Sequence, residues 1–163
     1  MTFIEAVVNV DSLKHTGKTK KPKIEELGEL FDTKVLEELS LNPNTANSSP
    51  QTIKELKQMV GMIQKLTDEQ KNRYLNTDED TSYYIKEYMS NNDLAYTDDD
   101  IEKITDSARH IGRQFKNKYM RPRPYVLAEK LGMEMDYFNT ETAQSPSYPS
   151  NHALQARVVA NYY

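Results

Sequence analysis

The chain has 163 residues, of which 37% are apolar and 28% are charged. This length suits one domain with a single hydrophobic core, and the composition lies toward the polar end of globular proteins. The net charge of −4 gives no reason to expect binding to nucleic acid or to an anionic membrane. Cysteine is absent, which excludes disulfides and thiolate metal sites.

The first residues predict neither export nor membrane insertion. Residues 1–10 contain an acid, no basic region and no long apolar stretch, and no later segment reaches membrane-spanning length. We therefore expect a soluble, cytoplasmic protein without a signal peptide or a membrane span. Residues 3–10 have a composition typical of β structure, and a lysine-rich polar stretch follows. We predict an extended basic arm over residues 1–23 and one helical domain over residues 24–163.

The first helices are indicated by apolar periodicity and by start signals. Apolar residues recur at three- and four-residue intervals over residues 24–39, which predicts a helix. Residues 42–49 have the composition of a loop. Ser49 as a cap and Pro50 in the first turn then predict a helix over residues 50–66.

Two shorter helices are predicted next. Thr67 and Gln70 have the spacing of a capping box, which indicates a helix that ends near Leu75. A further helix is predicted over residues 81–89.

The clearest start signal is Thr97, which three aspartates follow. It predicts a long helix over residues 98–119. A short segment over 125–131 and a last helix from Ser150 complete the chain, so we predict an all-α fold.

Two patterns that imitate ligand sites are better explained by structure alone. Residues 17–19, Gly-Lys-Thr, resemble the end of a phosphate-binding P-loop, but Ser12 stands where that loop needs a glycine. The acidic clusters at 78–80 and 98–100 lack the pattern of a calcium loop, and we interpret both as helix N-terminal residues. No metal site is predicted.

Residues 116–124, KNKYMRPRP, contain four cations close to a predicted helix end, and Lys116 and Arg123 are the two that matter here. A phosphoryl group in transfer carries its charge on three oxygens, so it needs several fixed donors. Lys116 supplies a point charge and Arg123 a planar fork, which flanking prolines hold in extended backbone. We predict that Lys116 and Arg123 bind phosphate.

Residues 149–152, PSNH, predict a helix start that faces an anion. The Ser150 hydroxyl can cap this helix, and the amides of Asn151 and His152 would point the same way. We predict Ser150 and Asn151 as phosphate-binding residues. His152, in the first turn, is the predicted general acid that protonates the leaving oxygen.

Together these motifs resemble a known superfamily. The spacing Lys-x6-Arg-Pro followed by Pro-Ser-x-His is similar to the first two signature motifs of the type 2 phosphatidic acid phosphatases, bacterial class A acid phosphatases and vanadium haloperoxidases. The string from Lys116 to Tyr125 most resembles the soluble acid phosphatases, and Arg121 within it is a candidate helper. The resemblance covers roughly residues 43–163, including a helical lead-in over 44–66. It implies a helical bundle like the acid phosphatase/haloperoxidase fold, lacking its C-terminal helices.

The chain departs from this family at two places. Asn151 stands where members usually have glycine, so we expect its side chain to narrow the pocket. The third motif, a Ser-Arg pair followed by a histidine and an aspartate, is missing; in the family that histidine attacks phosphorus. His15 and His110 lie in no such context, and each looks isolated from other ligand-type residues. The resemblance therefore implies a C-terminally incomplete domain whose nucleophile comes from sequence outside this chain.

Three functions remain open. The leading hypothesis is a phosphomonoester hydrolase of acid-phosphatase type, inactive as the isolated chain and with no cofactor. The alternatives are a non-catalytic structural or assembly protein on a truncated phosphatase scaffold, and a vanadium-dependent haloperoxidase, in which vanadate would be the cofactor rather than a phosphate mimic. The last helix carries Leu154, Val158 and Val159, so we also expect another polypeptide or subunit to cover its apolar face.

Overall fold

The computed structural model describes residues 10–17, 19, 42 and 44–163. Every regular element within these residues is helical, which confirms the all-α class for this part of the chain. The elements are α3 (Pro50–Ile63), α4 (Asp68–Glu79), α5 (Tyr83–Asn91), α6 (Asp98–Tyr119), α7 (Pro124–Lys130), the 3-10 helix η2 (Thr142–Gln144) and α8 (Asn151–Tyr162). None of the described helices is both long and apolar enough to cross a membrane.

Most of the predicted N-terminal features lie outside the described residues. These are the helix over 24–39 and the greater part of the basic arm over 1–23. Residues 10–12, which the structure does describe, have helical backbone, whereas the composition of residues 3–10 predicted β structure at Val10.

Polar caps begin four of the helices at the positions that the sequence indicated. Ser49, Thr97 and Ser150 each accept a hydrogen bond from a backbone amide of the first turn that follows. Thr67 and Gln70 form both bonds of a capping box. These caps satisfy amides that have no partner within a helix. The far end of α4 differs from the prediction, because this helix continues past Leu75 by about one turn.

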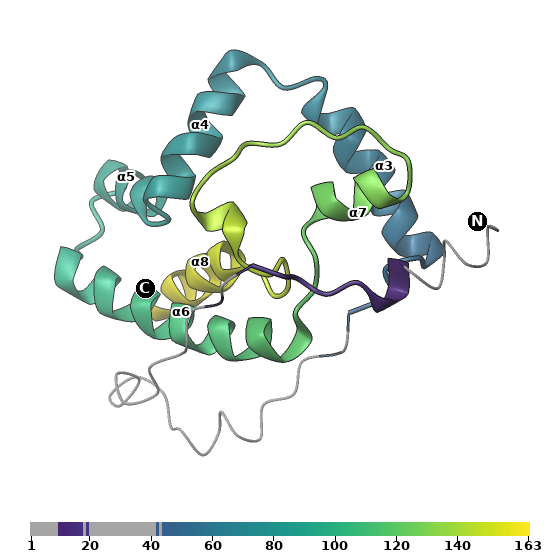
Figure 1. Ribbon diagram of the computed structural model, residues 1–163. Coiled ribbons are helices and arrows are strands. Elements are labelled where there is room, and N and C mark those ends of the chain that lie inside the picture. Colours follow the sequence, from purple (N-terminus) through teal and green to yellow (C-terminus); the bar gives the residue numbers. More distant parts are fainter. Residues whose placement is uncertain (1–9, 18, 20–41, 43) are drawn as a thin grey trace.

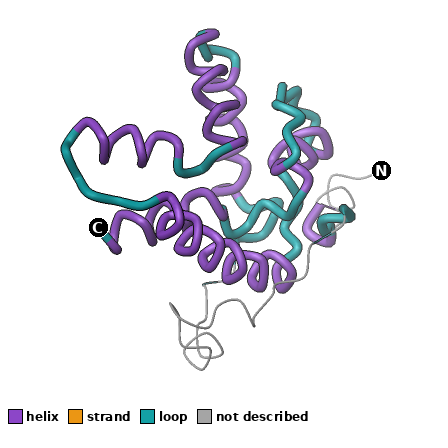
Figure 2. The backbone as a smooth tube through the Cα atoms, turned by 90° about the vertical axis from the view of Figure 1, so that its left-hand side faces the viewer, coloured by secondary structure: helices purple, strands orange, loops and turns teal. Residues whose placement is uncertain are grey.

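α6 and α8 lie side by side and form the best-packed pair of helices (Figure 1, Figure 2). Ile111 and Phe115 of α6 are buried, and Leu154 of α8 packs against them. Val159 of α8 is only 1% exposed. The apolar side of α8 therefore already has a cover in α6, so it gives no evidence for the additional polypeptide that we expected there.

A second apolar cluster joins the N-terminal segment to α3 and α7. It contains Val10, Leu56 and Leu127, all buried. The segment then runs toward the C-terminal end of α6, where the amide of His15 donates to the carbonyl of Met120 at 2.7 Å. In Figure 1, α3, α4 and α5 follow one another around an arc, and the chain between α7 and η2 returns along it toward α8.

Candidate functional site

A cavity of about 570 Å³ lies where the end of α4, the C-terminal half of α6, η2 and the start of α8 meet. The structure brings together here all five principal residues that the sequence proposed. Lys116, Arg123, Ser150, Asn151 and His152 all line this cavity. They come from three separate stretches of the chain, so the fold rather than sequence proximity assembles them.

Lys116 lies in the last turn of α6 and is only 5% exposed. Its ammonium donates a hydrogen bond to the carbonyl of Pro146. An ammonium group has three donors, so the bond to Pro146 leaves two for a ligand. Burial, and to a smaller extent repulsion by Arg123, lowers the Lys116 pKa to about 8.

Arg123 is the residue immediately before α7, and its backbone is extended as the flanking prolines predicted. Its Nε donates to the Ser145 carbonyl, and its Nη2 donates to the Thr142 carbonyl at 2.5 Å and to Ser145 Oγ at 2.9 Å. Burial lowers the pKa of Arg123. Within the described residues Nη1 has no such bond, and its two donors remain for a ligand. Arg123 and Lys116 thus also hold the loop that precedes α8.

The start of α8 has the cap that the sequence predicted. Ser150 Oγ accepts a hydrogen bond from the amide of Ala153 at 3.3 Å. The Asn151 side chain lies against Gly112 of α6, and a Cβ at Gly112 would overlap Asn151 Oδ1. This oxygen is buried and has no hydrogen-bond partner among the described residues. The asparagine therefore occupies space that a glycine on the neighbouring helix leaves free.

His152 is half-buried in the first turn of α8. Burial lowers its pKa, and the nearby cations Lys116, Arg123 and Arg109 lower it further, while Asp78 acts in the opposite direction. Without an anion, the neutral imidazole is therefore favoured near neutral pH. A bound phosphate would add negative charge and favour the protonated form that a general acid requires.

The cavity also contains charged residues that the sequence did not assign to it: Asp78, Glu79, Arg109, Arg113 and Glu141. Asp78 Oδ1 accepts a hydrogen bond from the Thr142 hydroxyl. Asp78 and Glu79 belong to the last turn of α4, so their interpretation as residues of a helix N-terminus was wrong. No local sequence pattern links these five residues to residues 116–124, because only the tertiary fold brings them together.

Arg121 and His15 lie near the site but not on the cavity wall. Arg121 Nη2 donates to Thr52 Oγ1 of α3 at 3.3 Å, which directs it away from the phosphate-binding candidates. His15 lies beside the Gln144 carbonyl, and burial followed by the charge of Arg123 lowers its pKa. His15 Nε2 is buried and has no hydrogen-bond partner among the described residues. His15 thus lies close to Arg123 and Gln144, although no group of three or more His, Asp or Glu side chains that could hold a metal occurs among the described residues.

The cavity combines clustered cations with carboxylates. Four cationic side chains, three carboxylates and His152 line the cavity beside a capped helix N-terminus. Comparisons with protein-family models, with curated proteins and with solved structures found no match to this chain.

Proposed function

We propose that this cavity is a phosphate site and that the chain contributes to phosphomonoester hydrolysis of the acid-phosphatase type. The observation that carries the proposal is the convergence of Lys116, Arg123 and the start of α8 on one cavity. Lys116 and the free Nη1 of Arg123 would hold two of the phosphoryl oxygens. The first amides of α8 would hold the third, since they point out of the helix and its dipole favours an anion.

His152 would act on the leaving group. When a phosphate ester fills the cavity, its charge raises the His152 pKa, and the imidazolium can protonate the leaving oxygen as the P–O bond breaks. The attack on phosphorus is assigned by the family resemblance to a histidine with a neighbouring aspartate, and residues 1–163 contain no such pair in a matching sequence context. In this proposal, the chain supplies the phosphate-binding residues and the acid, and the nucleophile comes from outside residues 1–163.

A second candidate function rests on the bonds that Lys116 and Arg123 already make. Both side chains donate to carbonyls of the loop over 142–146, and a non-catalytic protein on the same scaffold would keep these bonds to hold that loop. The two functions differ in one measurable respect. Only the phosphate site requires that an added anion bind to the remaining donors of Lys116 and Arg123.

Calorimetric titration of the full chain with orthophosphate, and separately with orthovanadate, tests the proposal. Arg123→Ala should weaken binding by about 1.5–3 kcal/mol, the usual range for a charge-assisted hydrogen bond. Arg157→Ala is the matched control, because Arg157 is an exposed arginine of α8 outside the cavity. Arg123→Lys retains the charge without the fork and shows an intermediate loss if the loop stays folded. Equal affinities for the Arg123 and Arg157 variants, or no binding at all, would favour the structural function.

A further inference from the structure

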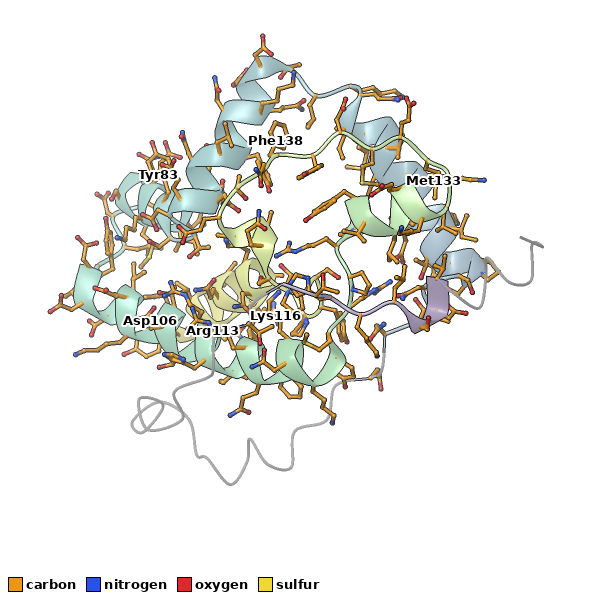
Figure 3. The ribbon with its side chains drawn as sticks, viewed as in Figure 1. Tyr83, Asp106, Arg113, Lys116, Met133 and Phe138 are labelled. Atoms are coloured by element: carbon orange, nitrogen blue, oxygen red, sulfur yellow. The ribbon has the colours of Figure 1, made fainter. Side chains whose placement is uncertain are left out.

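The cavity is larger than one phosphate group needs. A water molecule in the liquid occupies about 30 Å³ and a phosphate is only a few times larger, whereas the cavity measures about 570 Å³. The space beyond Lys116 is lined by two further arginines of the same helix, Arg113 and Arg109. Figure 3 shows Asp106, Arg113 and Lys116 following one another along α6.

Arg113 is a half-buried cation whose charge is only partly compensated. In the part of the chain that the structure describes, its guanidinium has no hydrogen bond and no ion pair. Its pKa is lowered by burial first and by repulsion from Arg109 second, with Asp106 partly opposing both. An arginine on a helix surface is most often simply hydrated. Arg113 differs because it loses hydration on a cavity wall and faces a second cation.

Arg109 has an ion-pair partner, but the pair is exposed to solvent. It pairs with Asp106 at 2.5 Å, and the two side chains are 41% and 45% exposed. An ion pair this exposed contributes little, so an incoming anion can displace or share it. The three carboxylates on the cavity wall, Asp78, Glu79 and Glu141, form no ion pair with either arginine among the described residues.

The cavity wall therefore carries two pairs of cations, and the two members of each pair repel each other. One pair is Lys116 with Arg123, and the other is Arg113 with Arg109. His152 lies within the electrostatic influence of both pairs, because Lys116, Arg123 and Arg109 all act on its imidazole. Along the axis of α6, Arg113 is displaced from Lys116 by about 4.5 Å and Arg109 by about 10.5 Å, as the helical rise per residue gives. This separation lets one short ligand reach both pairs.

We propose that the cavity binds an anion with two linked phosphoryl groups, the first held by Lys116 and Arg123 and the second by Arg113 with help from Arg109. The ligand class is a diphosphate, as the free anion or as its ester. This inference rests on the proposed function for the first phosphoryl group and extends it to a second. Each phosphoryl group neutralises one repelling pair, so the linked pair of groups should bind more tightly than a single phosphate.

The test compares inorganic pyrophosphate with orthophosphate on the full chain, by calorimetry at one pH and one ionic strength. The native chain should bind pyrophosphate about tenfold more tightly or better, as one additional charge-assisted contact implies. Arg113→Gln should remove most of that preference, because it should reduce the affinity for pyrophosphate much more than the affinity for orthophosphate. Lys103→Gln is the control, because Lys103 is an exposed cation of α6 outside the cavity. Arg109→Gln provides a second, more exposed variant, expected to reduce the preference by a smaller factor.

The outcomes separate the two proposals. Orthophosphate that binds through Arg123 with no gain for pyrophosphate would overturn the second phosphoryl site and leave the first intact. Equal losses of pyrophosphate affinity in the Arg113 and Lys103 variants would also overturn it, because they would show an effect of overall charge. Failure of both anions to bind would overturn the phosphate site itself. Circular dichroism of each variant establishes that the helices are retained.

Discussion

Lys116 is a cation in a setting that disfavours charge. It is 5% exposed, and its pKa falls from 10.5 to about 8 through burial and through repulsion by Arg123. Between about pH 8 and 10.5 the unfolded chain binds more protons at this lysine than the folded chain does, so stability contributed by this group rises with pH across that window. Below pH 8, the buried charge lowers the free energy of unfolding by roughly 3 kcal/mol. An anion beside Lys116 would reduce this penalty.

Anion affinity should therefore depend on pH near the Lys116 pKa. Sulfate, whose charge is constant in this range, should bind well below about pH 8 and progressively more weakly above it, by up to about tenfold per pH unit. The reason is that only the ammonium form attracts the anion. Calorimetry from about pH 7 to 9.5 at constant ionic strength measures this dependence. Lys116→Gln should bind sulfate weakly at every pH. If the pH dependence came from the α-amino group instead, it would persist in this variant. A flat profile for the native chain would contradict the assignment.

Among the charged neighbours that act on His152, Asp78 raises its pKa. Removal of this charge by Asp78→Asn should lower the His152 pKa further, because burial and three cations then act unopposed. NMR titration of the His152 ring protons gives the pKa directly. Asp68→Asn removes a carboxylate from the exposed first turn of the same helix, α4, and should leave the His152 pKa unchanged. An unchanged or raised His152 pKa in the Asp78 variant would show that Asp78 is too distant to act.

At the scale of helices, Gly112 is a contact point between α6 and α8. The Asn151 side chain occupies the space where a Cβ of residue 112 would lie. Gly112→Ala should lower stability by about 1 kcal/mol, since overpacking by 1–3 kcal/mol outweighs the gain in helix propensity. In an Asn151→Gly background the overlap disappears, and the same alanine should stabilise the protein by about 1 kcal/mol. Urea unfolding of the four proteins measures this change of sign.

Gly61 supplies the control for that experiment. It lies in α3, and a Cβ there would meet no atom within 4 Å. Gly61→Ala should therefore stabilise the protein in both backgrounds by a similar amount. If Gly112→Ala behaved like Gly61→Ala in the native background, the contact with Asn151 would not restrict the packing of the two helices.

The helix starts could be predicted because each one is encoded locally. Ser49, Thr67, Thr97 and Ser150 accept hydrogen bonds from amides within the next few residues, and that requirement leaves a short sequence signature. The end of α4 could not be predicted in the same way. This helix has no buried residue, so apolar periodicity carried no information past Leu75. The carboxylate of Asp78 reaches the cavity only because the helix continues that far.

The candidate site was predictable to a similar extent. Lys116, Arg123 and His152 belong to motifs whose chemistry can be predicted from residue type and spacing. Arg113 carries no such motif, because an arginine in the middle of an amphipathic helix is usually a solvated charge. The bonds from Lys116 and Arg123 to the carbonyls over 142–146 also escaped prediction, since they depend on the path of an irregular loop.

At the scale of the whole molecule, the proposed mechanism needs a histidine besides His152, and the described residues offer no further histidine to the cavity. His152 is the one histidine on the wall among the described residues; His110 is buried in α6, and His15 Nε2 is covered. In phosphoryl transfer through a histidine, nucleophile and acid act as a unit, so loss of either removes most of the acceleration while binding persists. Residues 1–163 alone should therefore bind phosphate and hydrolyse a generic phosphate ester at no more than trace rates.

An assay of the purified chain with a chromogenic phosphate monoester checks this expectation. His15→Asn is a useful companion, because the charges of Arg123 and Lys116 act on His15 although it does not line the cavity. Neither the native chain nor this variant should show turnover, although both should retain orthophosphate binding. Robust hydrolysis by the native chain, abolished by His152→Ala but not by His15→Asn, would show that residues 1–163 need no further histidine and would contradict this expectation. Hydrolysis abolished by His15→Asn would show instead that the N-terminal segment can move and present its imidazole to the bound phosphate.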